Sequence, residues 1–162
     1  MPGEIALRPV TEADQELLLA IYSSSRAMEM AAFPWSDAEK AAFLAGQFFC
    51  QDQHFRTACG GADFCIITVA GANAGRLVVH RGPAAVEIMD IALLEPFRGH
   101  GYGTRIIRQI MEEAAAAGLP VRLWVGHSNP ARRLYERLGG IHASDYGPQM
   151  EFVWPVQPKT PT

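Results

Sequence analysis

The sequence predicts one domain of mixed helix and strand, of the α/β (α+β) class. Three observations support this prediction: seven short strand-like segments, four helical segments, and a glycine-rich turn where the fourth strand leads into a helix. A chain of 162 residues is an ordinary size for one domain with its own core. We expect that domain over residues 1–156, followed by a short flexible tail at 157–162.

The strand-like segments are short apolar or alternating runs bounded by turn residues. Between the second and the third, residues 70–75 contain two glycines and an asparagine, a composition typical of a hairpin turn. The seven expected strands cover residues 5–9, 63–70, 76–80, 86–94, 121–125, 141–144 and 150–154.

The helices have recognisable first residues. Thr11 is placed to cap the first helix, and Ser36 with Glu39 forms a capping box before the second. Pro130 occupies the favoured first position of the fourth helix, which ends at Gly139. The four expected helices cover residues 12–23, 36–51, 103–117 and 129–139.

Charge and composition exclude several classes of protein. The chain has 14 Lys and Arg against 17 Asp and Glu, so an extended nucleic-acid surface is not expected. Its apolar runs are too short to cross a bilayer, and its first residues lack the basic start of a signal peptide. We expect a cytoplasmic protein with neither a nucleic-acid nor a membrane partner; a homodimer is left open.

The cysteines and histidines do not predict a metal site. Cys50, Cys59 and Cys65 are odd in number and lack the paired spacing of metal ligands. The five histidines form no His-x-x-x-His pair. We therefore expect reduced thiols, no metal, and no cysteine nucleophile.

The most informative stretch is the glycine-rich turn after the fourth expected strand. Bare backbone at a helix start attracts anions, because the first-turn amides lack intrahelical partners and carry partial positive charge. An arginine beside it adds a fork of donors suited to phosphate oxygens. A P-loop would need a nearby lysine, and a Rossmann fingerprint would need another glycine spacing and a later acidic residue. The residues expected to bind a phosphorylated ligand are Arg98, Gly99, His100, Gly101, Tyr102, Gly103 and Thr104.

Two motifs in this order resemble those of the Gcn5-related N-acetyltransferase (GNAT) family. The first is the Arg-x-x-Gly-x-Gly pattern that begins at Arg98, which is similar to the family's acyl-CoA pyrophosphate loop. The second is a helical segment with Asn129, Ala131 and Tyr135, which looks like the family's asparagine–alanine–tyrosine helix. The order of elements agrees over nearly the whole chain. One departure is Gly140, where the family commonly has phenylalanine.

The resemblance implies a GNAT fold. This fold is a mixed, mostly antiparallel central sheet of about seven strands flanked by four helices, with strands four and five splayed apart. It also implies acetyl-CoA as cosubstrate, its pantetheine arm bonding the backbone of the fourth strand. Besides the glycine-rich turn, the implied cofactor contacts are Ile91, Ala92, Leu93, Asn129, Ala131 and Tyr135.

The implied reaction is direct acetyl transfer to an amine in a ternary complex. Tyr135 matches the family tyrosine whose hydroxyl reaches the CoA sulfur, where it would act as general acid. A base must deprotonate the amine, whose pKa lies near 10. Glu87 is the first candidate because an ideal strand places it on the same face as Ile91; Asp90 is the second.

The acceptor is the part of the reaction that the sequence determines least. In this family the first two helices and their connection usually wall the acceptor site. In that connection Glu29 could pair with an ammonium group, and Phe33 and Trp35 could stack on one, although the same aromatics would also suit a core. We expect a small-molecule or peptide amine. The alternatives are a noncatalytic acyl-CoA binding or sensing domain and a generic nucleotide-binding module.

Overall fold

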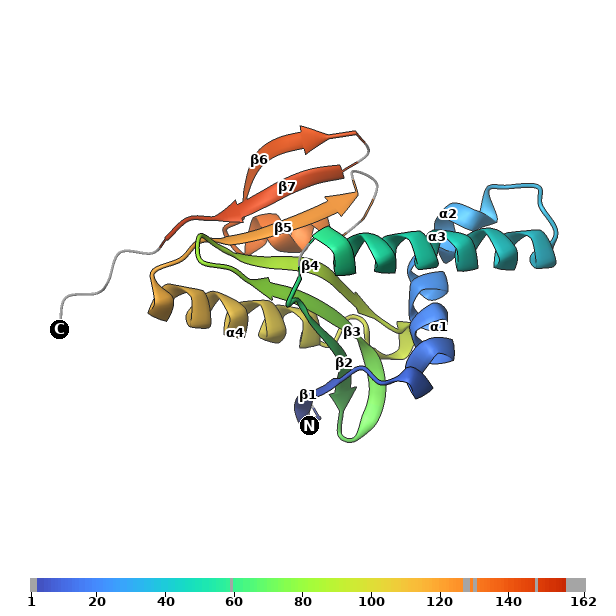
Figure 1. Cartoon of the computed structure of the whole chain (residues 1–162), viewed down its shortest axis with the longest axis horizontal. Coiled ribbons are helices and arrows are strands. Elements are labelled where there is room, and N and C mark those ends of the chain that lie inside the picture. The colour runs from blue at the N-terminus through green and yellow to red at the C-terminus, as the bar shows by residue number, and fades with distance from the viewer. Residues whose placement is uncertain (1–2, 59, 127–128, 130, 148, 157–162) are drawn as a thin grey trace. The chain divides into compact units, whose positions relative to one another are not determined.

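The computed structural model describes residues 3–58, 60–126, 129, 131–147 and 149–156 (Figure 1). Within these residues seven strands form one sheet, in the order β1-β2-β3-β4-β5-β7-β6. The tail expected at 157–162 lies outside the described residues, as do Cys59 and Pro130. The strands are β1 Ile5–Pro9, β2 Asp63–Val69, β3 Ala72–Arg81, β4 Val86–Leu93, β5 Val121–Gly126, β6 Ile141–Tyr146 and β7 Gln149–Trp154.

The sheet confirms the expected mixed, mostly antiparallel architecture. β1 pairs with β2, β5 with β7, and β6 with β7, all in antiparallel registers. β4 and β5 run parallel, with register pairs from Val86↔Val121 to Ile88↔Leu123. β4 continues to Leu93, so in the described chain only the first part of the strand pairs with β5, as expected for splayed strands.

The described chain contains five α-helices, one more than the sequence predicts. The extra helix, α2, lies where a connection was expected, because its Ala-Met-Glu-Met-Ala sequence forms helix well but is too short to show a periodicity. The first predicted helix opens with a 3-10 turn, η1 (Glu12–Asp14), and the second continues past residue 51. The α-helices are α1 Gln15–Ser25, α2 Ala27–Ala31, α3 Asp37–Ala58, α4 Tyr102–Ala117 and α5 Arg132–Arg137.

The turn between β2 and β3 is shorter than predicted. It consists of Ala70 and Gly71, whose φ angles of 50° and 84° suit a two-residue hairpin turn. Residues 72–75 therefore belong to β3. The prediction failed because Gly75 looks like a turn residue but serves packing: a Cβ there would overlap the carbonyl oxygen of Ala92 on β4.

The chain forms two compact units, each with its own buried residues. The first unit contains residues up to Val78 together with Ile91–His100. Its helices α1, α2 and α3 bury an apolar cluster with β2, because leucine and aromatic residues recur on their inner faces. The cluster consists of Leu18, Tyr22, Met30, Leu44, Phe48 and Ile66.

The second unit contains Val79–Asp90 and the residues from Gly101 onward. α4 is amphipathic, with buried residues recurring three or four positions apart, and it ends at Ala117, the residue predicted; Gly118 follows in a left-handed conformation. The buried residues of α4, β5 and β7 are Tyr102, Ile106, Ile107, Ile110, Ala114, Val121, Leu123, Val125, Met150, Phe152 and Trp154.

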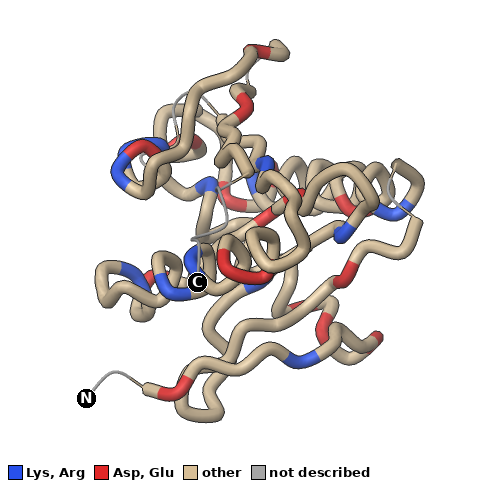
Figure 2. Tube along the Cα trace, turned by 90° about the vertical axis from the view of Figure 1, so that its left-hand side faces the viewer, with Lys and Arg blue, Asp and Glu red and all other residues tan. Residues whose placement is uncertain are grey.

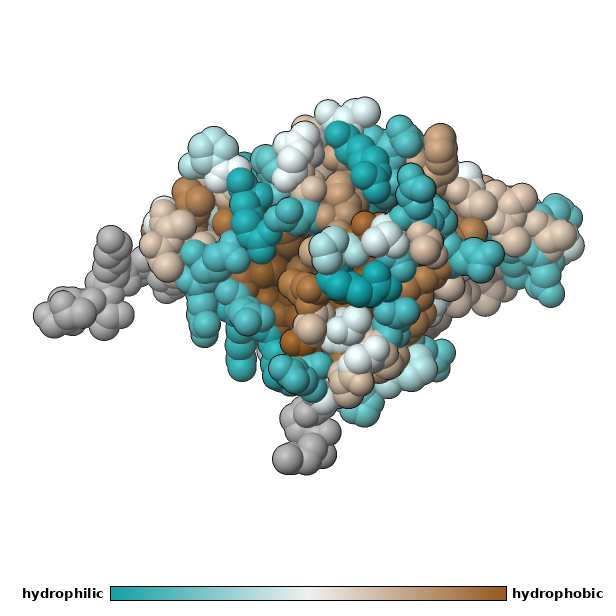
Figure 3. All heavy atoms as spheres, turned by 60° about the horizontal axis from the view of Figure 1, so that its bottom comes forward, coloured by the Kyte–Doolittle hydropathy of each residue, from teal (hydrophilic) through white to brown (hydrophobic). Residues whose placement is uncertain are grey.

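Basic and acidic residues are interspersed along the described trace (Figure 2). On the face drawn in Figure 3, hydrophilic residues cover most of the surface and apolar residues show between them. In the described part of the chain, no helix combines the length and the apolar character needed to span a membrane.

Candidate functional site

The glycine-rich turn presents open backbone at the start of α4. Gly99 and Gly101 have φ angles of 76° and 83°, a left-handed conformation that favours glycine. Gly101 is the N-cap of α4 and brings no side chain to cap its first turn. A Cβ added at either glycine would meet nothing within 4 Å, so a ligand could approach the backbone closely.

The remaining residues of the turn differ in exposure. His100 is exposed, whereas the Tyr102 side chain is buried in the second unit. Gly103 and Thr104 are half-buried in the first turn of α4. The expected phosphate contacts of these residues therefore rest on the backbone of the helix start rather than on a cluster of charged side chains.

Arg98 already has two protein partners. Its Nε donates a hydrogen bond to the carbonyl oxygen of Leu93 (2.8 Å), and its Nη2 donates one to the hydroxyl of Ser24 (3.1 Å). The arginine thus joins the turn to the end of β4 and to α1. The sequence does not identify Ser24 as a partner, because no local pattern relates two residues that lie so far apart in the chain.

The expected pantetheine edge is the end of β4. Ile91, Ala92 and Leu93 are half-buried there. β3 lies close against this segment, because Gly75 has no side chain to keep it away from the carbonyl oxygen of Ala92. Next to the edge, the Leu94 amide donates a hydrogen bond to the carbonyl oxygen of Ala74 (2.8 Å).

Tyr135 is buried in α5, with 4% of its surface exposed. Its ring packs edge-on against Phe152 and Trp154 of β7, with ring centroids 5.9 Å and 6.3 Å away. Burial raises the pKa of Tyr135 well above the usual value for a phenol, and the negative charge of Asp90 raises it further. The hydroxyl therefore holds its proton firmly and can serve as a hydrogen-bond donor.

Asp90 lies on the same face of the sheet as Tyr135. Register pairs join Ile88 of β4 to Leu123 of β5, and Leu123 to Phe152 of β7, so these side chains share the face on which Tyr135 packs. Alternation along β4 places Asp90 on this face too. It places Glu87, which pairs in register with the exposed Arg122, on the opposite face.

The end of α5 is packed tightly beside β7. The Gly140 amide donates to the carbonyl oxygen of Tyr135 (3.0 Å), and Trp154 Nε1 donates to that of Leu138 (3.1 Å). A Cβ at Gly140 would lie 2.9 Å from the Trp154 ring. The departure noted at Gly140 therefore leaves room for the tryptophan that packs on Tyr135.

Asn129 does not begin α5, which corrects the predicted helix start. The helix begins at Arg132 with Ala131 as its N-cap. The Asn129 side-chain oxygen instead accepts a hydrogen bond from the Ala131 amide (2.9 Å), which closes a turn ahead of the helix. An asparagine favours this turn as readily as a cap, so the sequence could not separate the two.

The three expected acceptor contacts lie on α2 and the following connection. Glu29 pairs with Arg26 through Oε2 and Nη1 at 3.5 Å. Phe33 and Trp35 stack on each other with centroids 4.8 Å apart, and Trp35 also contacts the edge of Phe43. All three aromatic rings are partly exposed, so they form an apolar surface rather than a buried core.

Metal ligands do not gather in the described residues. No group of three or more His, Cys, Asp or Glu side chains there is arranged to hold a metal ion. Cys50 and Cys65 form no disulfide within the part of the chain that the structure describes.

Comparison with known proteins relates this arrangement to a family. The model of the acetyltransferase (GNAT) family matches residues 19–140, well over half of the chain. No curated protein matches the sequence.

Solved structures with the same fold include several acetyltransferases. The PaiA N-acetyltransferase from Thermoplasma acidophilum, in complex with coenzyme A, has a TM-score of 0.69 at 13% identity, over 94% of this chain and 99% of that one. The ribosomal-protein-S18-alanine N-acetyltransferase from Escherichia coli has a TM-score of 0.63 at 17% identity, over 97% of each chain. Ard1 from Thermoplasma volcanium has a TM-score of 0.58 at 19% identity, over 94% of this chain and 97% of that one. At these identities the likeness shows a shared fold.

Proposed function

The chain belongs to the acetyltransferase (GNAT) family, and from this membership we propose that it is an N-acetyltransferase that moves the acetyl group of acetyl-CoA to an amine. The observation that carries the proposal is a buried Tyr135 whose proton is held with the help of Asp90. A domain that only bound or sensed acyl-CoA would need the glycine-rich turn but not this pair.

The glycine-rich turn and the end of β4 fit acetyl-CoA. Acetyl-CoA supplies the acetyl group as a reactive thioester. The open backbone at Gly99 and Gly101 would hold the pyrophosphate through amides, and residues 91–93 would bond the pantetheine arm through their backbone. To reach a phosphate with its full fork of donors, Arg98 would release Leu93 or Ser24.

Asp90 and Tyr135 would act together as base and acid. While Asp90 is charged, it helps keep the pKa of Tyr135 high. Once Asp90 has taken a proton from the ammonium group of the acceptor, it is neutral, and one cause of the raised pKa disappears. Tyr135 is then a better proton donor for the leaving sulfur. Glu87 is the alternative base.

The proposed acceptor is an amine of a small molecule or a peptide, bound together with acetyl-CoA. The Escherichia coli neighbour is named for an alanine of a ribosomal protein, which supports a peptide amine. Phe33 and Trp35 would offer aromatic faces to a cationic amine. Glu29 would contribute only if the amine displaced Arg26, its present partner.

The test is thiol release from acetyl-CoA across a panel of polyamines, amino acids and short peptides. We expect turnover with at least one amine, and a loss in kcat of about 10²- to 10⁴-fold in Tyr135→Phe, with CoA affinity unchanged. Tyr146→Phe is the matched control, because Tyr146 is exposed on β6. Its kcat should equal that of the native protein.

Other results would contradict the proposal in distinct ways. Tight CoA binding without turnover of any amine would favour a sensing domain. ATP competing with CoA, with no dependence on the pantetheine arm, would favour a nucleotide-binding module. A stable acetyl-cysteine together with ping-pong kinetics would show that the acetyl group passes through a covalent acetyl-enzyme rather than directly to the amine.

A further inference from the structure

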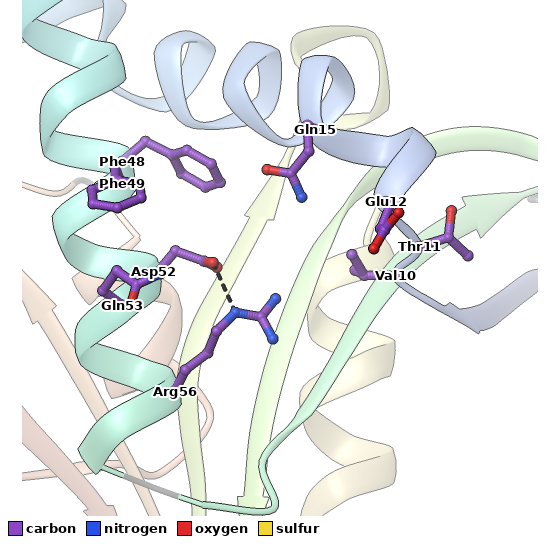
Figure 4. A pocket seen from close by; sticks show the side chains of 9 residues that line it. All are labelled: Val10, Thr11, Glu12, Gln15, Phe48, Phe49, Asp52, Gln53 and Arg56. Carbon is purple, nitrogen blue, oxygen red and sulfur yellow. Dashed lines mark hydrogen bonds and ion pairs between the residues drawn. The ribbon is translucent and has the colours of Figure 1, made fainter.

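The first unit contains a pocket whose residues are separate from those of the proposed acetyl-transfer site. It has a volume of about 420 Å³ and lies between α3 and the segment that leads from β1 into α1 (Figure 4). That volume suits a small molecule. We call it the α1–α3 pocket; the lining residues that decide what it can bind are Glu12, Gln15, Phe48, Phe49, Asp52, Gln53 and Arg56.

Contacts with neighbouring side chains hold the guanidinium of Arg56 in place. Its Nε donates to Asp52 Oδ2 (2.9 Å), and its guanidinium lies 4.3 Å from the centre of the Phe64 ring. The other oxygen of Asp52 accepts from Arg76 (3.0 Å), which is only 2% exposed. Asp52 is thereby anchored to the core, and Arg56 is anchored to Asp52.

The two Nη atoms of Arg56 remain directed into the pocket (Figure 4), where they form no hydrogen bond or ion pair with any described residue. Two parallel N–H donors on a fixed plane match the two oxygens of a carboxylate. Because the guanidinium is already ordered, a ligand would lose little free energy in ordering it.

The opposite wall of the pocket carries a negative charge. Glu12 lies at the start of η1 and has no ion-pair partner among the described residues. Phe48 and Phe49 provide an apolar wall on α3, and Gln15 on the opposite side supplies an amide group that can both donate and accept hydrogen bonds. Glu12 and Asp52 balance Arg56 and Arg76, so a ligand without net charge suits the pocket better than an anion or a cation.

We propose that the α1–α3 pocket binds a free amino acid with an apolar side chain, its carboxylate on Arg56 and its ammonium group near Glu12. The apolar side chain lies against Phe48 and Phe49. A simple carboxylate would face the repulsion of Glu12, and a simple amine would face that of Arg56. Only a zwitterion carries both a carboxylate to pair with Arg56 and an ammonium group to pair with Glu12.

The test is calorimetric titration of the full chain, without acetyl-CoA, with leucine and phenylalanine. We expect both to bind, and 4-methylpentanoate and isopentylamine, which each lack one charged group of leucine, to bind at least about tenfold more weakly. Arg56→Gln should weaken leucine binding by a similar factor and remove the preference for leucine over isopentylamine. Glu12→Gln should remove the preference over 4-methylpentanoate.

Both substituted residues are exposed, so neither variant should unfold the chain. Arg81→Gln is the matched control, because it also breaks an exposed arginine–carboxylate pair, with Glu113, but in the second unit. The Gln15 and Gln53 side-chain amide signals in NMR spectra should shift on leucine binding. No binding of either amino acid at millimolar concentrations, or binding that neither variant changes, would overturn the proposal. Neither result depends on whether the chain acetylates an amine.

Discussion

Tyr135 keeps its proton for two physical reasons that act in the same direction. Its ring is buried against Phe152 and Trp154, where a phenolate would lose its hydration, and the carboxylate of Asp90 repels a second negative charge. The pKa of Tyr135 thus lies further above the pKa of a thiol than the pKa of a free phenol does. Burial, the larger cause, remains when Asp90 takes up a proton, so in our proposal the loss of the Asp90 charge makes Tyr135 a better proton donor but does not give it the pKa of a free phenol.

At the scale of the residue, this coupling predicts different effects for the two candidate bases. Asp90→Asn should lower kcat by about 10²- to 10⁴-fold and lower the pKa of Tyr135, because one of its two causes is removed. Glu87→Gln is the matched control and should lower kcat by less than about tenfold. The chain has four tyrosines, so the titration of Tyr135 is the tyrosinate absorbance of each variant as pH rises, less that of the same variant carrying Tyr135→Phe. A larger loss in Glu87→Gln would assign the base to Glu87.

At the scale of the element, the close approach of β3 to β4 depends on a glycine, which has no side chain. Gly75 lets β3 approach the carbonyl oxygen of Ala92, in the part of β4 expected to bond the pantetheine arm. A side chain at Gly75 would push that backbone away. The glycine therefore contributes to the shape of the edge although it would touch no ligand.

Gly75→Ala should destabilise the protein by about 1–3 kcal/mol, because the added methyl group overpacks a strand interface, and it should weaken CoA binding. Gly46→Ala in α3 is the control, because its Cβ would meet nothing within 4 Å. That change should raise the free energy of unfolding by about 0.5–1 kcal/mol, since alanine favours helix over glycine. Denaturant unfolding measures the free energy of unfolding of both variants. A Gly75→Ala protein as stable as the native one would contradict the packing argument.

At the scale of the whole molecule, the carboxylate of Asp14 forms hydrogen bonds that link β1 to the residues leading into α1. Asp14 accepts two hydrogen bonds from Arg8 of β1, at 2.9 Å each, and one from the Thr11 amide. Arg8 also donates to Asn73 of β3 (3.1 Å). The Arg8 guanidinium holds the pKa of Asp14 well below its usual range, and the Thr11 amide lowers it further.

This depressed pKa predicts acid sensitivity. In the unfolded chain Asp14 titrates near pH 3.9, so below about pH 4 the unfolded chain binds a proton that the folded chain does not. The free energy of unfolding should therefore fall as the pH drops through this range. In Asp14→Asn the fall should be shallower. Glu16→Gln, which removes an exposed carboxylate of α1, controls for net charge; an equal slope in Asp14→Asn and the native protein would contradict the prediction.

Much of the fold could be predicted because its signals are local. Ser36 caps α3 as expected, with the Glu39 amide donating to the serine hydroxyl (3.1 Å), and α4 ends at Ala117, the residue predicted. Predictions failed where a local signal had two meanings. Gly75 was expected in a turn but allows two strands to pack closely, and Asn129, the predicted first residue of the fourth helix, closes a turn ahead of α5.

The sequence by itself predicted the family, the order of elements and the place of the glycine-rich turn before a helix, because each depends on residues adjacent in the chain. Only the tertiary structure decided which carboxylate shares a face with Tyr135, and that Arg98 binds Ser24. It also decided that Arg76 anchors the wall of the α1–α3 pocket. These relations depend on strand register and on packing between distant segments, and no local pattern encodes them.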